Sequence, residues 1–157
     1  MDYIPIAVRL GEHDLSTDID CTVIGYEAGV EEIHCAPPIQ DIPIQHSLAH
    51  PRYDFPRFAN DIGLIRLSRK PDMTLGNIGP ICLPITSELQ QYQSPKFEVA
   101  GFGMTEGATR SDVLLKINVP FVDQDKCQLK HGRNIQISEG HFCAGGFGIQ
   151  DACKGKF

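Results

Sequence analysis

Asp61 is the first residue whose type and position could give it a catalytic role. It stands at the mouth of a strongly apolar run, 62–67, directly after Asn60. One interpretation is an aspartate that caps a turn at the start of a strand. The other is a buried carboxylate that orients a histidine. The residues around Asp61 leave both interpretations open.

A second candidate region is rich in glycine and lies near the end of the sequence. Cys143 is followed by Ala-Gly-Gly, and Asp151 and Cys153 precede Gly155. One interpretation is a loop held by a disulfide, with glycines for positive φ angles. The other is a binding pocket with Asp151 at its floor, where Gly155 offers a backbone N–H to an oxyanion.

The cysteines favour disulfide bonds, and so an oxidising compartment, rather than a metal site. They form no Cys-x-x-Cys pair and no close cluster with histidine, so the sequence does not support a zinc site. Six cysteines among proline-rich and glycine-rich stretches favour disulfides and an oxidising compartment. The sequence opens without the basic and apolar segments of a signal peptide. We therefore expect either reduced structural thiols or a chain that is not the whole of a secreted protein.

Short strands are the elements expected to position these residues. Apolar or alternating runs bounded by Gly, Pro or Asp occur at 7–10, 42–47, 62–67, 97–102, 115–121 and 141–144. Their lengths predict the strands of an all-β barrel or sandwich. A helix is predicted only near 123–131, where Asp123 is suited to cap the first turn and Lys130 to lie in the last.

Composition and charge limit the classes of function. The 157 residues are 41% hydrophobic and 22% charged, which is typical of one globular domain or a large piece of one. No run approaches the length of a membrane span, so no membrane partner is expected. The formal net charge of −6 argues against nucleic acid, because phosphates require a basic face.

Taken in order and spacing, these motifs resemble those of the trypsin/chymotrypsin family of serine endopeptidases (peptidase S1). The resembling segments are Val8–Asp14, His50-Pro51-x-Tyr53, Asn60-Asp61-Ile62, Pro80–Pro84, Val99–Gly103, Cys143-Ala144-Gly145 and Asp151-x-Cys153-x-Gly155. The insert at 21–35 and the Ala36-Pro37-Pro38 that follows it resemble the arthropod clip-domain branch. The resemblance implies a partial peptidase domain over 7–155, built from parts of two antiparallel β-barrels.

The resemblance also implies roles for three residues. Asp61 matches the triad aspartate, which accepts a hydrogen bond from the catalytic histidine and fixes its tautomer. Asp151 matches the acid at the base of the specificity pocket, which pairs with Arg or Lys of a protein substrate. Gly155 matches one backbone donor of the oxyanion hole. The family implies a secreted zymogen of an extracellular cascade such as innate immunity, with serpin-type inhibitors as further partners.

Disulfides and a metal loop follow from the same resemblance. It implies the pairs Cys21–Cys35 and Cys127–Cys143, and it leaves Cys82 and Cys153 unpaired within this sequence. Glu12 and Asp14 match a loop that holds calcium in some relatives. Oxygen ligands suit that ion, although solvated surface acids are the alternative interpretation. No other cofactor is expected.

Two catalytic residues of the family are not found in this sequence. No Thr-Ala-Ala-His-Cys motif precedes Asp61, and none of the six histidines is assigned as the base. Lys156 and Phe157 stand where the family has Asp-Ser, and a phenyl ring has no hydroxyl to attack a carbonyl. We predict that the chain as given is inactive. The alternative is a non-catalytic serine protease homologue that acts as a binding cofactor.

The two ends fall outside the resemblance. Gly155-Lys156-Phe157 can be encoded with a splice-donor consensus, and the codons before Ala7 allow an acceptor-like AG. Our hypothesis is that residues 1–6 and 156–157 are translated intron. Genomic codons incompatible with those signals would contradict it.

Overall fold

The computed structural model describes residues 4–91, 94–103, 110–131, 137–138 and 140–145. Its contacts divide the chain into two compact units. One comprises Met1–Ser47, Ile65–Cys82 and Asp112–Leu114, and the other Leu48–Leu64, Leu83–Ser111 and Leu115–Phe157. Each unit is built mainly of antiparallel strands, so the all-β prediction is confirmed at the level of fold class.

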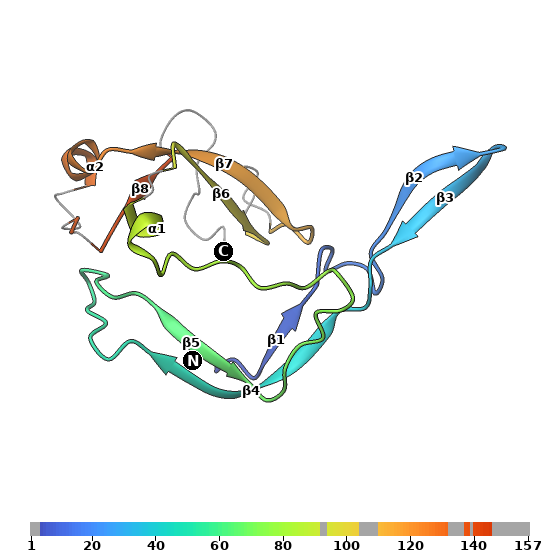
Figure 1. The fold of residues 1–157 in the computed structure, drawn as a ribbon, viewed down its shortest axis with the longest axis horizontal. Coiled ribbons are helices and arrows are strands. Elements are labelled where there is room, and N and C mark those ends of the chain that lie inside the picture. The colour runs from blue at the N-terminus through green and yellow to red at the C-terminus, as the bar shows by residue number, and fades with distance from the viewer. Residues whose placement is uncertain (1–3, 92–93, 104–109, 132–136, 139, 146–157) are drawn as a thin grey trace. The chain divides into compact units, whose positions relative to one another are not determined.

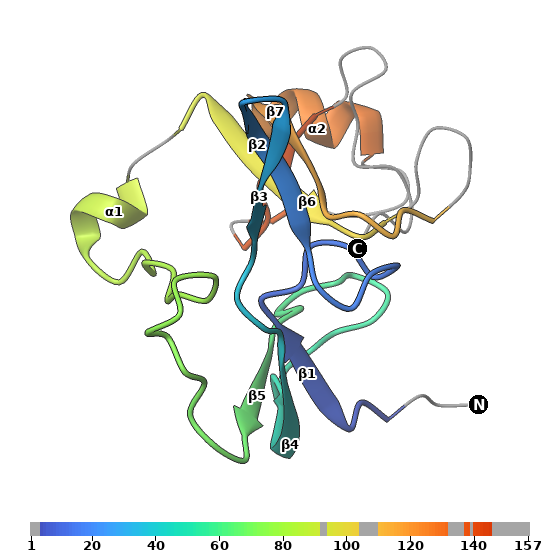
Figure 2. The same cartoon turned by 90° about the vertical axis from the view of Figure 1, so that its right-hand side faces the viewer.

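A three-stranded sheet has the order β1 (Ala7–Leu10), β4 (Gln40–Ala49), β5 (Gly63–Leu67). Figure 2 shows these strands side by side with β4 between the other two. Alternation along β4 buries Ile42 completely, at 0% exposure. On the opposite face, Arg9 Nε and Nη2 donate to the two carboxylate oxygens of Asp41, both at 2.9 Å, across the β1–β4 ladder. This pair is bidentate, which fixes the register as well as the charges.

Gln40 joins β4 to the segment after β5. Its carboxamide oxygen accepts the backbone N–H of Asp72 at 2.8 Å, and its amide nitrogen donates to the Asp72 carbonyl at 2.7 Å. The residue is buried. Both polar groups of a buried side chain are therefore satisfied by the backbone of one residue, as buried polar groups require.

β2 (Cys21–Glu27) and β3 (Val30–Cys35) form a separate two-stranded ribbon. Figure 1 shows it projecting away from β1 and β4. Ala28 and Gly29 form the turn with φ of 50° and 84°, the left-handed geometry favoured in two-residue hairpins. A disulfide joins Cys21 to Cys35 at the other end. No strands were predicted here, because glutamates interrupt the apolar alternation.

The other unit contains a second three-stranded sheet of order β6 (Lys96–Gly101), β7 (Leu115–Val122), β8 (Cys143–Ala144). Val119 on β7 is 2% exposed and forms part of the core. The ring of Phe97 lies with its centroid 6.2 Å from that of Phe121 and 4.9 Å from that of Phe142. These ring contacts join β6 to β7 and to the residue directly before β8.

Two short helices belong to the same unit. The predicted one is α2 (Gln124–His131), and the Asp123 carboxylate accepts the Asp125 backbone N–H at 3.0 Å as its N-cap. The prediction of a single helix is wrong, because α1 (Ser87–Gln91) is also present. Five residues are too few to show helical periodicity. Among the described residues no helix is long and apolar enough to cross a membrane.

The strand bounds differ from the predicted ones by a few residues. β4 is two residues longer at each end than the predicted 42–47, and of the predicted strand 141–144 only Cys143–Ala144 is strand. The His141 backbone N–H donates to the Ser138 carbonyl at 2.9 Å, so the chain is still turning where the strand was expected to begin.

Candidate active site

Asp61 lies at the end of the loop that joins β4 to β5. Backbone hydrogen bonds close this loop in steps: His50 N–H to the Ile62 carbonyl, Tyr53 N–H to the His50 carbonyl, and Asp54 N–H to the Ala59 carbonyl, each at 3.0 Å. A loop bonded to itself in this way holds its terminal residues in fixed positions.

Asn60 sets the backbone immediately before Asp61. Its φ is 57°, a left-handed value that asparagine tolerates better than most residues. Its side-chain amide donates to the Arg52 carbonyl at 2.8 Å, and its own carbonyl accepts the Ile62 N–H at 2.8 Å. Asp61 is thus held between two residues whose backbones are hydrogen-bonded.

The Asp61 carboxylate itself is exposed. In the part of the chain that the structure describes, no side chain or backbone N–H bonds to it, and no described histidine ring is among its partners. Among the described residues the Asp61 side chain is thus exposed rather than buried, and its role in orienting a histidine stays a prediction. The carboxylate oxygens are available to accept a hydrogen bond from an imidazole.

His141 contacts the Asp61 loop in a different way. One ring nitrogen, Nδ1, lies 2.8 Å from Ser138 Oγ, and the other, Nε2, lies 3.2 Å from the Phe58 carbonyl. The tautomer that carries its proton on Nε2 satisfies both contacts, with Nε2–H donating to Phe58 and Nδ1 accepting from Ser138. His141 thus fastens the loop to the segment before β8. The sequence does not predict this role of His141, because nothing in the spacing of the residues brings Phe58 and His141 together.

The predicted pocket residues lie outside the described residues. Asp151, Cys153, Gly155, Lys156 and Phe157 all fall there. The described part ends at Gly145, whose φ of 88° is suited to glycine and whose N–H donates to the Pro120 carbonyl at 2.8 Å.

Both disulfides that the resemblance implied are present. Cys127 on α2 is bonded to Cys143 on β8, and Cys21 to Cys35 across the ribbon. Cys82 is exposed and free. The first bond ties a helix to the strand that leads toward the predicted pocket.

The loop expected to hold calcium is closed by its own hydrogen bonds. Glu12 Oε1 accepts the backbone N–H groups of His13 at 3.0 Å and Asp14 at 3.1 Å. Asp14 Oδ1 accepts the Ser16 hydroxyl at 2.6 Å, which lowers the pKa of Asp14. The Asp20 carboxylate accepts the Thr17 hydroxyl at 2.8 Å, which lowers its pKa in the same way.

These contacts test whether the loop fits a calcium ion. The carboxylate oxygens face N–H and O–H donors, whereas a calcium ion needs several of them free to converge on one point. Among the described residues no group of three or more acids, histidines or cysteines could hold a metal. The loop in this conformation does not fit the ion.

The fold matches a solved serine protease. The structure titled "Crystal structure of drosophila Grass clip serine protease of Toll pathway" aligns with a TM-score of 0.80 and 37% sequence identity, over 96% of this chain and 41% of that one. This match defines the class as a trypsin-like fold of antiparallel strands.

Sequence comparison places the chain within that class. The Trypsin family model matches residues 22–156, and the chain belongs to this family. It is 39% identical over 150 residues to "Serine protease grass" of Drosophila melanogaster, covering 94% of this chain and 38% of that protein. It is 40% identical over 154 residues to "CLIP domain-containing serine protease HP8" of Bombyx mori, covering 94% and 39%. The chain therefore spans about two fifths of the length of these relatives.

Proposed function

We propose that this chain is part of a serine endopeptidase that cleaves polypeptides after Arg or Lys. The observation that supports this most is the match to clip-domain proteases at about 40% identity over nearly the whole chain. Asp61 would orient the catalytic imidazole, Asp151 would pair with the basic substrate residue, and Gly155 would donate its N–H to the oxyanion.

The setting proposed with it is an extracellular zymogen cascade. Two disulfides support an oxidising compartment, and the matched Grass structure is titled as a protease of the Toll pathway. Protein substrates and serpin-type inhibitors are the partners that this setting implies.

These 157 residues alone are proposed to be inactive. Without an assigned base or a hydroxyl nucleophile, most of the roughly 10⁶-fold contribution of a catalytic triad is lost. The purified chain is expected neither to hydrolyse an arginyl ester nor to be labelled by an organophosphate. Either result in material free of contaminating protease would overturn this proposal.

Sequencing the transcript across both ends tests whether the chain is part of a complete serine endopeptidase. We expect an Asp-Ser-Gly-Gly-Pro motif to follow Gly155 in the complete product. That product, once activated, should hydrolyse arginyl and lysyl esters and reject neutral ones. Asp61→Asn should lower kcat by roughly 10³–10⁴-fold, and Asp151→Asn should remove the preference for a basic residue. Asp18→Asn is the matched control, because Asp18 is an exposed acid outside the proposed site.

A non-catalytic homologue is the second candidate. It is favoured by Lys156 and Phe157 at the positions where the family has Asp-Ser. A complete transcript that keeps Phe157 and continues through the remaining strands would support this candidate over the first.

A further inference from the structure

The β2–β3 ribbon carries large apolar side chains without packing partners. The two strands pair only with each other among the described elements. Their register sets Val23 opposite Ile33, and Tyr26 opposite Glu31. Ile33 and Glu31 are two residues apart on β3 and therefore point to the same face, which their partners Val23 and Tyr26 share. Val23 and Tyr26 are three residues apart, and the register shift between Val23 and Gly25 brings them to one face.

We call Val23, Tyr26 and Ile33 the apolar ribbon face. Tyr26 is 71% exposed, Ile33 58% and Val23 43%. An ordered strand that leaves such side chains in water gains little from the hydrophobic effect, and exposed apolar groups on one face are typical of an interaction surface. Val30, which pairs with Glu27 on the other face, and Ile24 at the register shift are also exposed, at 70% and 59%. A two-stranded ribbon has no second layer of its own to cover them.

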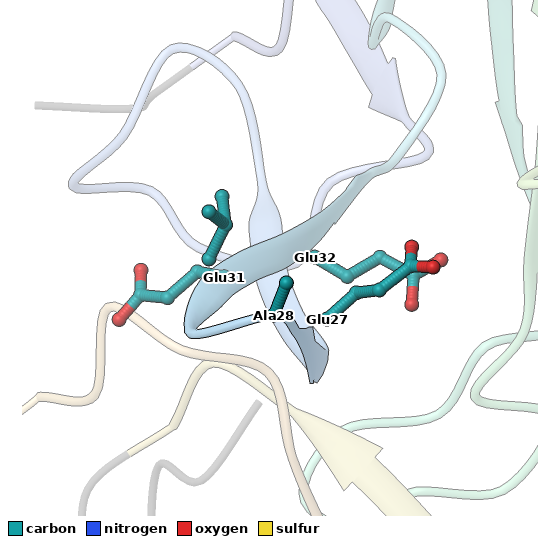
Figure 3. Close-up of a pocket in the computed structure, with 5 residues that line it drawn as sticks. Glu27, Ala28, Glu31 and Glu32 are labelled. Carbon is teal, nitrogen blue, oxygen red and sulfur yellow. The ribbon is translucent and has the colours of Figure 1, made fainter.

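Three glutamates lie near the turn, Glu31 on this face and Glu27 and Glu32 on the other. Figure 3 shows Glu27 and Glu32 pointing to one side of the ribbon and Glu31 to the other, and all three line a pocket at its tip. None of the three carboxylates has a hydrogen bond or an ion pair with any described residue. The ribbon therefore presents negative charge that nothing described neutralises.

The charge extends beyond the ribbon. Residues 10–51 contain eight of the 20 acidic residues and none of the 14 Lys and Arg residues. Such a one-sided distribution attracts a cationic partner and repels an anionic one. The negative charge therefore indicates that a partner which covers the apolar ribbon face is cationic.

We propose that the ribbon docks a basic polypeptide segment in which apolar side chains alternate with Lys or Arg. The apolar side chains would lie on Val23, Tyr26 and Ile33. The basic side chains would reach round to Glu27, Glu31 and Glu32, since long cationic side chains can lie along apolar surface while their charged ends meet an acid.

Charge disfavours two other occupants. A second copy of this chain, packed ribbon to ribbon, would bring Glu31 toward its symmetry mate and one acidic stretch against another. A membrane surface with anionic lipids would repel the same glutamates. The proposed docking goes beyond the peptidase function and needs no hydrolysis, so either can fail without the other.

The test uses the full 157-residue chain displayed on yeast, where the secretory pathway forms the disulfides and low surface density limits aggregation. The probe is a labelled 12-residue peptide of alternating Lys and Val. Two matched peptides replace Lys by Glu, or Val by Ser. The Lys–Val peptide should bind at least about tenfold more tightly than either, and its affinity should fall at least about fivefold from 0.05 M to 0.5 M NaCl.

Variants of the ribbon locate the binding. Glu31→Lys and Tyr26→Ser should each weaken the Lys–Val peptide at least about fivefold. Glu88→Lys makes the same change of charge outside residues 10–51, and Leu129→Ser removes an even more exposed apolar side chain from α2. Both controls should stay within about twofold of the unchanged chain. Mass spectrometry of the Cys21–Cys35 bond in each variant shows that the ribbon has formed.

Several outcomes would overturn the proposal. Equal affinity for the Lys–Val and Lys–Ser peptides would mean attraction by charge alone, without the apolar face. Equal losses in Glu88→Lys and Glu31→Lys would mean that the ribbon is not the site. Binding of the labelled chain itself, or of phosphatidylserine vesicles, that Tyr26→Ser abolishes would assign the face to a different occupant.

Discussion

At the scale of single residues, hydrogen bonds to carboxylates lower the pKa values of acids in the loop before the ribbon, Asp20 among them. The Thr17 hydroxyl is the main cause of the lowered pKa of Asp20, with the N–H groups of His13 and Asp14 adding to it. A charged acceptor strengthens such bonds, so the folded chain favours the ionised carboxylate.

Replacing Thr17 by Val should raise the pKa of Asp20 toward its ordinary value of 3.8. Because the folded pKa lies below the unfolded one, the stabilisation is present above the unfolded pKa and is lost as the pH falls through the folded pKa. The variant should therefore be less stable at neutral pH, with the difference vanishing in acid. Resistance of the displayed chain to thermolysin at pH 7 and to pepsin at pH 3 compares the stability of the variant with that of the unchanged chain. Thr22→Val, on the ribbon, should leave this stability unchanged.

Asn60 carries both a left-handed backbone and a side-chain hydrogen bond to Arg52. Asn60→Ala loses the bond and places a Cβ in the left-handed region, whereas Asn60→Gly loses only the bond. The alanine variant should cost about 1 kcal/mol more than the glycine variant. Its rate of limited trypsin cleavage at Arg52 and Arg57 should be about fivefold higher than that of the glycine variant. Equal cleavage rates in the two variants would show that the left-handed backbone at residue 60 does not affect the stability of the loop.

At the scale of elements, one side chain, that of Gln40, contributes two hydrogen bonds to the contact between β4 and the segment after β5. Gln40→Met keeps the volume and removes both hydrogen bonds to Asp72. The free energy of unfolding should fall by roughly 1–3 kcal/mol, because two backbone groups lose their partner. Protease resistance of the displayed chain measures the loss. Gln45→Met, which removes one exposed bond from Arg66, should cost less than about 0.5 kcal/mol.

Elements with strong local signals could be predicted from the sequence, and elements without them could not. The period-two run at 115–121 and the N-cap Asp123 are local, and β7 and α2 lie where they were expected. The ribbon depends on pairing across a turn and on a disulfide, which a local pattern does not show. Asp61 was found by its motif, but its exposure depends on what packs around it. The link from His141 to Phe58 joins residues far apart in sequence, and only the fold reveals it.

At the scale of the whole molecule, little of the apolar surface is buried. Among the described residues only Ile42, Val119 and Cys127 are buried hydrophobic side chains, whereas many large ones are exposed. Those on β5 and in the segment after it include Leu64, Ile65, Ile81, Leu83 and Ile85. A chain with so small a core has little to offset its conformational entropy.

The 157-residue chain should therefore aggregate when it is purified at micromolar concentration. Size-exclusion chromatography with light scattering should show mostly large species, some of them linked through the free thiol of Cys82. Cys82→Ser should remove disulfide-linked oligomers that depend on this thiol and leave the non-covalent aggregates. A monomeric chain with one cooperative thermal transition would contradict this expectation.

The bond between Cys21 and Cys35 has a consequence for how this protein can change over time. It closes the ribbon at its base, so residues 22–34 are held as a hairpin, and among the described elements its strands pair with no other strand. Substitutions there can alter the choice of partner without disturbing the scaffold. The hairpin can therefore be exchanged as a unit. Grafting it onto a relative should transfer the binding of a basic polypeptide segment and leave the fold of that relative unchanged.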